Sequence, residues 1–573
     1  MITDLKINPK EKERYYKLNY WGTDTLCDVW NVQAARYAAR TYVKDDLGGV
    51  LTYGEVDRLS SRLAAWLKYE AHVENGDVVT FQVPKWVEFC IIYVACLKVG
   101  AVMHPIATNF NIEDLRYAFG LVKPRAYICP TFYKGVDFEK RFDSIEDDLK
   151  QGLSVLLIDK IDAPRSDSKL PSLSDVLSRC QSIEEKAPSS SDDVACILMT
   201  SGTTGKPKAA LLTHNNILFS ERSYVSVLDL TPDDVAWMPS PLNHATGFFH
   251  GLIATMLVGS STVLELCFSA DDALRLIKQE GCTWSHGATP FVHDIVAYME
   301  KTGDRAPSLR FYLCGGAPIP GSMVKRAHKL GFLLCESYGS TESCPHVYVP
   351  LDKCIEWNGA WSGIAYDGIE ICVVDNDRRP VPFGVQGEEC SRGPHQFVGY
   401  LNDKERTDKA LDDDGWFYSG DLCVMDEEGR IRITGRKKEI LIRGGENISS
   451  NEVDEGVAGC PGIGDHATIG MPDDRLGERI CTFAVPEGEN RPGIPDIQRY
   501  LKEKGVPKRL WPERIEYIDE IPYTKTGKVK RFKLSLELEA RLKAERETSK
   551  TSGDEWTLAL KQPFTTRSNY GKQ

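Results

Sequence analysis

The stretch with the clearest chemical content is a run of hydroxyl, glycine and lysine residues, Thr200-Ser-Gly-Thr-Thr-Gly-Lys-Pro-Lys208. It follows the apolar run 194–199, which predicts a buried strand. Glycines let the backbone approach a ligand closely, hydroxyls donate hydrogen bonds and lysine adds positive charge, so the loop suits phosphate oxygens. A plain turn with helix-capping threonines is the simpler alternative. The spacing argues against a Walker A loop, because these glycines are three apart and a proline follows the lysine.

Other segments carry further residue types that suit a nucleotide. They offer glycines after a strand, an aromatic ring beside a hydroxyl and a carboxylate, a carboxylate in a turn, a guanidinium, and a lysine on a Gly/Thr loop: Gly315-Gly-Ala-Pro318, Tyr338-Gly-Ser-Thr-Glu342, Tyr418-Ser-Gly-Asp421, Gly435-Arg436 and Pro522-Tyr-Thr-Lys-Thr-Gly-Lys528. Each also has an ordinary explanation: core packing for the tyrosine, turn or helix-start positions for the acids, and exposed salt bridges or a solvated face for the basic residues.

Bulk composition narrows the class of protein. The 573 residues carry a formal net charge of -13, which argues against a general nucleic-acid binder. The 17 cysteines include no C-x-x-C pair, so neither a zinc site nor a disulfide framework follows from them. The N-terminus lacks the apolar core of a signal peptide, and the apolar run 89–97 is too short for a transmembrane segment and predicts a buried helix. We therefore expect a cytoplasmic protein.

The elements that must position these groups alternate between strand and helix. Strands are predicted at 77–83, 126–129, 154–158, 261–266 and 309–314. Helices are predicted within 51–67, where a short strand leads into a helix with apolar residues from 56 to 67, and at 86–99, from 271 onward and at 323–330. This pattern predicts an α/β fold with a large N-terminal domain of mixed or parallel sheets and flanking helices. Ligands in such folds bind at the carboxyl ends of the strands, where the 200–206 loop is expected to lie.

The pattern of predicted strands and turns changes after residue 360. Shorter strands and Gly/Asp turns follow residue 360, and about 100 residues beyond residue 437 predict a small α+β unit with strands near 467–470 and 480–485 and a helix at 497–504. We therefore expect a large domain over 1–436, a small mobile domain over 437–533 and a charged extension over 534–573 that includes a helix from 534 to 547.

The order and spacing of the motifs over roughly residues 20–535 resemble the adenylate-forming superfamily of acyl-CoA synthetases, luciferases and peptide-synthetase adenylation domains. The segments His244-Ala-Thr-Gly-Phe248 and Gly287-Ala-Thr-Pro-Phe291, and the run from Gly435 through Arg443-Gly-Gly-Glu-Asn-Ile-Ser449, are most similar to bacterial short- and medium-chain fatty acyl-CoA synthetases and alicyclic acid–CoA ligases. Such enzymes use ATP, Mg²⁺ and coenzyme A. They couple a carboxylic acid to AMP with release of pyrophosphate, and then pass the acyl group to the CoA thiol.

The resemblance implies a role for each motif. The ATP-binding residues would be Thr200, Ser201, Gly202, Thr203, Thr204, Gly205, Lys206, Gly315, Gly316, Ala317, Pro318, Tyr338, Asp421 and Arg436, with Tyr338 stacked on adenine and Asp421 bound to ribose. Thr341 would donate to the α-phosphate, Glu342 would hold Mg²⁺ and Lys528 would bridge the attacking carboxylate and the α-phosphate. Lys438 would be the hinge of the small domain, and Gly444 and Gly445 would line the CoA tunnel.

The substrate is expected to be a small-molecule carboxylic acid. By resemblance its pocket is lined by His244, Phe248, Ala288 and Gly339. Asn243-His244 replaces the Phe-Asp typical of amino-acid activation, and the nearby phenylalanines favour a medium-chain or alicyclic acid over an aromatic one. An aromatic acid, a carrier-protein thiol as the acceptor, a luciferase-type oxygenase, a non-catalytic binding protein and a homodimer stay open.

Overall fold

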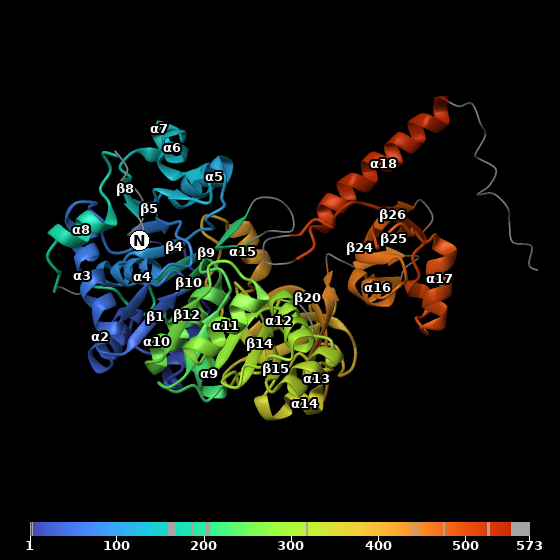
Figure 1. Ribbon diagram of the computed structural model, residues 1–573, viewed down its shortest axis with the longest axis horizontal. Coiled ribbons are helices and arrows are strands. Elements are labelled where there is room, and N and C mark those ends of the chain that lie inside the picture. The colour runs from blue at the N-terminus through green and yellow to red at the C-terminus, as the bar shows by residue number, and fades with distance from the viewer. Residues whose placement is uncertain are drawn as a thin grey trace, which may run out of the picture. The chain divides into compact units, whose positions relative to one another are not determined.

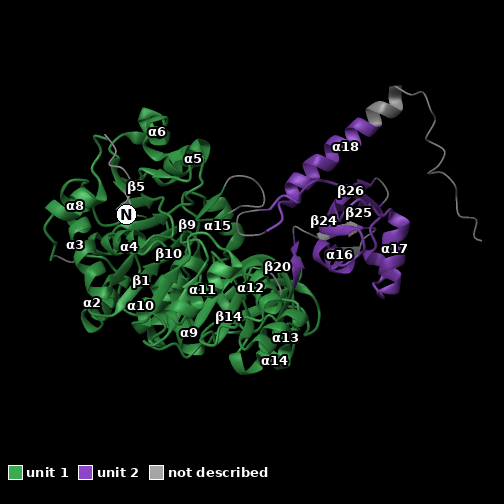
Figure 2. Ribbon diagram, in the orientation of Figure 1, with its two compact units in different colours: residues 1–433 green, residues 434–573 purple. Residues whose placement is uncertain are grey.

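The computed structural model describes residue 2 and residues 4–158, 168–184, 187–200, 207–316, 319–437, 440–443, 446–473, 476–523 and 528–551. The chain divides into two compact units, residues 1–433 and 434–573 (Figure 2). The expected α/β class is confirmed, because parallel sheets with helices form the first unit and a smaller α+β unit follows it. The finer domain limits and the hinge stay predictions.

The largest sheet has nine strands and carries three of the predicted site segments. Several of its strands, such as β14 and β15, are labelled in Figure 1. Its central strands are parallel, and antiparallel strands flank them at both edges. In spatial order they are β17 (Ile364–Ala365), β16 (Cys344–Tyr348), β15 (Leu333–Ser340), β14 (Phe311–Gly315), β13 (Trp284–Ala288), β11 (Val235–Met238), β12 (Ser261–Leu264), β1 (Thr41–Asp45) and β2 (Val50–Thr52).

A second sheet of six strands contains the two strands that flank the predicted phosphate loop. Its order is β10 (Lys208–Thr213), β9 (Val194–Thr200), β4 (Val102–Pro105), β3 (Val78–Phe81), β5 (Ala126–Pro130) and β8 (Ser154–Ile158). All neighbours are parallel except β9 and β10, which pair antiparallel with Thr200 opposite Lys208. The loop therefore joins the two strands of a hairpin, and β10 then leads into a helix.

The main core lies around the helices that connect these sheets. Helix α4 (Glu88–Val99) is the predicted buried helix, and every residue from Phe89 to Leu97 is buried. It packs with α2 (Leu26–Arg36) and α3 (Tyr53–Tyr69) in one cluster that includes side chains of both sheets. A capping box at Thr52 and Glu55 starts α3, and the left-handed Gly100 ends α4.

The remaining helices of the first unit cover the sheets and their edges. They are α1 (Pro9–Lys17), α5 (Ile112–Val122), α6 (Phe138–Asp143), α7 (Asp147–Lys150), α8 (Leu173–Arg179), α9 (His214–Val227), α10 (Ala254–Val258), α11 (Ala270–Glu280), α12 (Thr289–Thr302), α13 (Gly321–Leu330), α14 (Cys354–Trp357) and α15 (Lys404–Ala410). Helices α11, α12 and α13 share a second core with β11, β13 and β14. A four-stranded sheet completes the region: β18 (Glu370–Val374), β19 (Gly387–Arg392), β20 (Phe417–Met425) and β21 (Ile431–Arg436).

The second unit has helices on both faces of one sheet. The sheet contains β22 (Ile440–Arg443), β23 (Glu446–Ser449), β24 (Ile463–Asp473), β25 (Gly477–Pro486) and β26 (Arg514–Tyr517). Ile480 and Ala484 of β25 pack with α16 (Ser450–Val457) and α17 (Ile494–Glu503), while Cys481 and Phe483 pack with α18 (Arg531–Thr551). The alternation follows from the two-residue period of a strand. Among the residues with described structure, no helix has the length and apolarity needed to cross a bilayer.

Candidate active site

The carboxyl edge of the nine-stranded sheet gathers three of the predicted segments. Ala288 at the end of β13 pairs with Gly315 at the end of β14, and the preceding residue Cys314 pairs with Glu336 of β15. Tyr338 follows two residues after Glu336 on the same strand. The parallel register therefore brings the 287–291, 315–316 and 338–342 segments to one edge, where ligands bind in such sheets. Ala317 and Pro318 lie outside the described residues.

Glycine is required at two positions of this edge. A Cβ atom on Gly339 would lie 2.0 Å from the carbonyl oxygen of Cys344, because β15 and β16 approach closely at this point. Gly316 has a φ of +92°, a conformation that residues with side chains rarely adopt. Gly315 is also close-packed, since an added Cβ would lie 3.2 Å from Nε2 of His286. These contacts explain the glycines locally, whatever ligand the edge holds.

Tyr338 is joined to two carboxylates by its hydroxyl group. The hydroxyl lies 3.0 Å from Oδ2 of Asp421 and 3.2 Å from Oε2 of Glu389. Both acids are buried, on β20 and β19, and Glu389 also pairs with Nε2 of His346 at 3.2 Å. Burial, with the two acids adding to it, raises the pKa of Tyr338 well above its usual value, so the phenol stays a donor. The predicted adenine and ribose residues therefore lie in direct contact.

Glu342 belongs to a second hydrogen-bonded group. It lies in the turn between β15 and β16, next to Thr341, and Ser340 Oγ accepts from its backbone N–H at 3.2 Å. The hydroxyl of Tyr400 donates to Glu342 Oε1 at 2.7 Å, and Nζ of Lys208 donates to that hydroxyl at 3.0 Å. Lys208 pairs with Thr200, so the base of the predicted phosphate loop is tied to Glu342. Residues 201–206, which include Lys206, lie outside the described residues.

The arrangement of Glu342 fits a shared metal ion. One carboxylate oxygen is held by Tyr400, and no described residue donates a hydrogen bond to the other, Oε2. Glu342 is only half-buried, so that oxygen can face a ligand. The described residues contain no group of three or more His, Cys, Asp or Glu side chains that would hold a metal ion by themselves. A single carboxylate suits a Mg²⁺ ion that draws its other ligands from phosphate oxygens and water.

The predicted acyl-pocket segment forms an unexpected helix. Residues Thr246–Ile253 form a π-helix directly after His244, whose Nδ1 lies 3.2 Å from the hydroxyl of Thr246. A Cβ on Gly247 would lie 2.2 Å from the carbonyl oxygen of Pro241, so the turn needs glycine there. Phe248 is fully buried against the rings of Phe89 and Tyr93, in the main core. Its role as a pocket wall stays a prediction.

Three stacked rings lie behind this edge. Tyr224, His250 and His286 are buried with ring centroids 4.8 to 5.8 Å apart, and Tyr224 contacts Nδ1 of His286 at 3.0 Å. Glu221 contacts Nδ1 of His250 at 3.1 Å. Burial lowers the pKa of His250 to about 3 and raises the pKa of Glu221 well above its usual value. The physical result is a neutral polar cluster beneath the segment that includes His244.

In the second unit, Arg436 ends β21 and Lys528 lies in a loop. That loop is closed at its base by a bridge between Tyr523 and Val529 and by a 2.7 Å hydrogen bond from the Lys530 N–H to the Pro522 carbonyl. Lys528 is exposed. Gly435 has a φ of +158° beside Ser449. The predicted hinge and tunnel residues Lys438, Gly444 and Gly445 lie outside the described residues.

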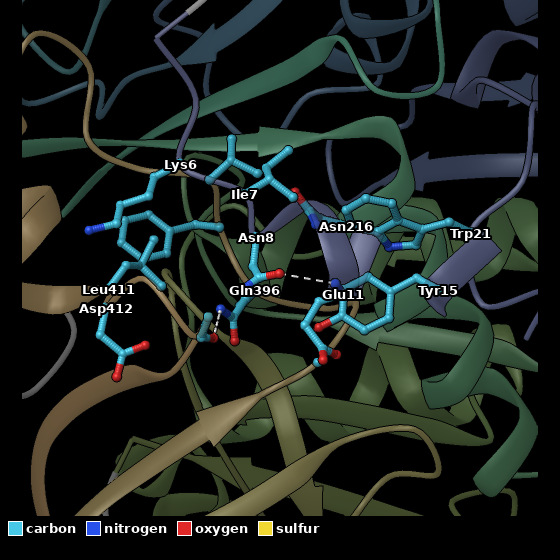
Figure 3. Close-up of a pocket in the computed structure, with 14 residues that line it drawn as sticks. Lys6, Ile7, Asn8, Glu11, Tyr15, Trp21, Asn216, Gln396, Leu411 and Asp412 are labelled. Atoms are coloured by element: carbon cyan, nitrogen blue, oxygen red, sulfur yellow. Dashed lines mark hydrogen bonds between the residues drawn. The ribbon is translucent and has the colours of Figure 1, made fainter. Parts of the chain in front are cut away.

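One small pocket of the first unit lies apart from these groups (Figure 3). It is lined by the N-terminal segment from Lys6 to Trp21, by Asn216 and by residues between Gly393 and Gly415. Figure 3 shows Asn8 bound to the backbone of Glu11, and the side-chain amide of Gln396 donates to the backbone carbonyl of Gly415. Among the described residues, none of those predicted for ATP or the acid lines this pocket.

The sequence matches the family described as AMP-binding enzyme over residues 30–401, and the AMP-binding enzyme C-terminal domain over residues 452–528. The chain belongs to the AMP-binding enzyme family. It is 40% identical over 543 residues to a medium-chain fatty-acid–CoA ligase of Escherichia coli, with 95% of each chain covered. It is 30% identical over 502 residues to a feruloyl-CoA synthase of an Amycolatopsis species, with 87% of this chain and 96% of the relative covered.

Solved structures support the same assignment. The ATP-bound MatB from Rhodopseudomonas palustris superposes with a TM-score of 0.79 at 25% identity, covering 89% of this chain and 98% of that one. The predicted membership of the adenylate-forming superfamily is therefore confirmed, as is the expectation that the chain is an enzyme.

Three residues of this AMP-binding enzyme contact the predicted site but were missed from the sequence. They are Lys208, Glu389 and Tyr400. Lys208 is the second lysine of the loop motif, and its place at the start of β10 was the available signal. Glu389 and Tyr400 lie in the run 387–400, which reads as a polar strand and a turn. Only the fold shows that this run contacts both Tyr338, through Glu389, and Glu342, through Tyr400.

Proposed function

We propose that this AMP-binding enzyme is an ATP-dependent acid–CoA ligase that first forms an acyl-adenylate and then a CoA thioester. The observation that carries the proposal is the 40% identity over 95% of both chains with a medium-chain fatty-acid–CoA ligase. The edge that joins Tyr338 to Asp421 and the nearby Glu342 supports it, since these residue types suit adenine, ribose and a metal-bound phosphate.

In the first half-reaction, a carboxylate oxygen of the acid attacks the α-phosphorus of ATP. The bond from that phosphorus to the bridging oxygen breaks, and pyrophosphate leaves. Because an anion approaches a polyanion, electrostatic stabilisation is the main task of the protein. Residues 200–206 would enclose the β- and γ-phosphates, Thr341 would donate to the α-phosphate, and Arg436 would contact the ribose or phosphate. Lys528 would bridge the carboxylate and the α-phosphate.

Glu342 would hold Mg²⁺ through its Oε2 atom, while Tyr400 occupies Oε1. The ion, when bound, neutralises phosphate charge and lowers the electrostatic barrier to attack. Tyr338 would stack on adenine with its hydroxyl on Asp421, and Asp421 would accept from the ribose hydroxyls.

In the second half-reaction, the CoA sulfur attacks the acyl carbonyl and AMP leaves with its phosphate oxygen. Lys438 would act as the hinge that lets the small domain present Gly444 and Gly445 to the pantetheine chain. Glycines suit such a tunnel because they leave room for a thin chain. A carrier-protein thiol in place of CoA is the alternative acceptor.

We propose a medium-chain or alicyclic monocarboxylic acid as the substrate. An aromatic acid is the second candidate, because a feruloyl-CoA synthase is 30% identical over 87% of this chain. The test is a panel of linear C4–C14, alicyclic and aromatic acids, scored for AMP release with and without CoA. The proposal requires acid-dependent AMP release that CoA accelerates, with the highest kcat/KM for a medium-chain or alicyclic acid. A preference for ferulate-like acids would replace the substrate, and ADP as the product would overturn the reaction.

The role of Lys528 has its own test. The Lys528→Ala variant should lose about 10²–10³-fold of ATP–pyrophosphate exchange, because it removes the positive charge between two anions. Thioester formation from supplied acyl-adenylate should stay near the wild-type rate. Lys533→Ala, at an exposed position on α18, is the matched control. Equal loss of both half-reactions would contradict this division of labour.

A further inference from the structure

The hydroxyl of Tyr400 stands between a predicted metal ligand and the base of the predicted phosphate loop. It lies 2.7 Å from Glu342 Oε1 and 3.0 Å from Lys208 Nζ, and that ammonium group also lies 4.3 Å from the centre of the Tyr400 ring. An ammonium group has no acceptor and an ionised carboxylate has no donor. The directions of the two hydrogen bonds are therefore fixed: Lys208 donates to Tyr400, and Tyr400 donates to Glu342.

The backbone around Tyr400 holds this hydroxyl in place. The N–H of Tyr400 donates to Thr407 Oγ1 at 2.9 Å, and the ring packs on Phe397 at 4.8 Å. The segment also pairs with β10, through hydrogen bonds between Leu211 and both Val398 and Gly399, at 2.9 Å each. The N–H of Phe397 donates to the carbonyl oxygen of Glu342 at 2.7 Å. One short segment thus fixes Glu342 through both its backbone and its side chain.

We propose that Tyr400 is a positioning residue, which rests on the proposed function and on the metal role of Glu342. Its hydroxyl occupies one carboxylate oxygen and turns the other toward the ion, and its contact with Lys208 links that carboxylate to the strand that ends the phosphate loop. A glutamate side chain has several rotamers to lose, so fixing it before the ion arrives strengthens ion binding. Tyr400 itself touches neither the ion nor the substrates.

The test is the Tyr400→Phe variant, which keeps the buried ring and removes only the hydroxyl. ATP binding is measured by calorimetry at a series of Mg²⁺ concentrations, without any acid substrate. The variant should need about tenfold more Mg²⁺ for half-maximal ATP affinity, and its affinity at saturating Mg²⁺ should approach that of the wild type. In pyrophosphate exchange the variant should likewise need more Mg²⁺ for half-maximal rate. Its loss of kcat should be smaller at saturating Mg²⁺ than at low Mg²⁺.

Tyr16→Phe is the matched control. The Tyr16 hydroxyl donates to Asp192 Oδ1 at 2.7 Å, and Lys12 pairs with the same acid at 2.8 Å, but Asp192 precedes β9 at the end opposite Thr200. This variant should keep the wild-type Mg²⁺ dependence. A second variant, Lys208→Met, should raise the Mg²⁺ requirement by less than Tyr400→Phe, because Glu342 keeps its donor.

The outcomes separate this proposal from the proposed function. An unchanged Mg²⁺ requirement in folded Tyr400→Phe, or an equal shift in Tyr16→Phe, would overturn the positioning role. Wild-type protein that binds Mg²⁺ and ATP but releases AMP with no acid would overturn the ligase function and leave the binding comparison valid. If Tyr400→Phe does not fold, the Lys208→Met variant decides: a Mg²⁺ requirement equal to the wild type would overturn the proposal.

Discussion

Two tyrosines of the predicted site, Tyr338 and Tyr400, donate to carboxylates, and they differ in what lies behind those acids. Tyr338 donates to Asp421 and Glu389, which are buried strand residues backed by His346. Tyr400 donates to the half-buried Glu342 in a turn, with Lys208 behind the hydroxyl. The first group is an enclosed part of the sheets, whereas the second has one side joined to the predicted phosphate loop. A change to the first should alter stability and nucleotide binding together, and a change to the second should alter chemistry with little effect on stability.

The largest effect is expected at Glu342. Glu342→Gln keeps an oxygen that can accept from Tyr400 but removes the charge that would hold Mg²⁺, so ATP–pyrophosphate exchange should fall about 10²–10³-fold. The midpoint of thermal unfolding should change little, because the side chain is half-buried and its hydrogen bond survives. Glu405→Gln, at an exposed position on α15, is the control. A Glu342→Gln variant that unfolds at a much lower temperature but keeps its exchange rate would contradict this comparison of the two groups.

At Tyr338 we expect smaller effects on two quantities, the unfolding free energy and the affinity for ATP. Tyr338→Phe leaves two buried acids without their shared donor, which should cost about 1–3 kcal/mol of unfolding free energy. ATP affinity should fall about tenfold, because Asp421 loses the hydrogen bond that orients it. Denaturant unfolding and ATP calorimetry measure the two quantities. Tyr348→Phe on neighbouring β16 is the control, since its half-exposed ring stacks on Tyr366.

The role of Glu389 sharpens this test. The double variant Tyr338→Phe with Glu389→Gln replaces one of the two buried acids by an amide that can donate. It should recover part of the lost unfolding free energy, because one buried negative charge is gone. A double variant less stable than Tyr338→Phe alone would mean that Glu389 is held mainly by His346 and not by the tyrosine.

The same two groups show what the sequence reveals and what it hides. The strand pattern placed Gly315 directly after the predicted strand 309–314, whereas β13 and β15, which carry Ala288 and Tyr338, were not predicted; parallel pairing in the structure brings the three segments together. The buried helix at 89–97 was equally predictable, because a continuous apolar run of that length has few other uses. Resemblance added the roles, and those stay predictions for Thr341, Asp421, Arg436 and Lys528.

The contacts of Glu389 and Tyr400 could not be predicted in the same way. Both depend on how the 387–400 run folds back across β10 and β15, which are separated from it by up to 192 residues. Nothing local in that run indicates a buried acid, since Glu388 and Glu389 are identical in type and only Glu389 is fully buried. The π-helix at 246–253 was missed for a related reason, because its glycines make close contacts with residues of other elements.

The smallest effect separates the two groups by their response to acid. His395 stacks on His346 at 5.2 Å, is fully buried, and neither of its ring nitrogens has a hydrogen-bond partner among the described residues. Burial, with His346 adding to it, lowers the pKa of His395 well below 6.5. Below pH 6.5 the unfolded chain therefore binds a proton that the folded protein does not, so stability falls as the pH falls.

At pH 5.5 that one histidine should cost about 1.4 kcal/mol relative to pH 7.5. His395→Gln removes the titration and should therefore lose about that much less unfolding free energy over the same pH interval, whatever its stability at pH 7.5. Urea unfolding followed at both pH values measures the difference, and His328→Gln, at an exposed position on α13, should keep the wild-type slope. An unchanged slope in His395→Gln would mean that a proton reaches this ring in the folded state. The Tyr338 group, unlike the Tyr400 group, is enclosed, and that enclosure would then not extend as far as His395.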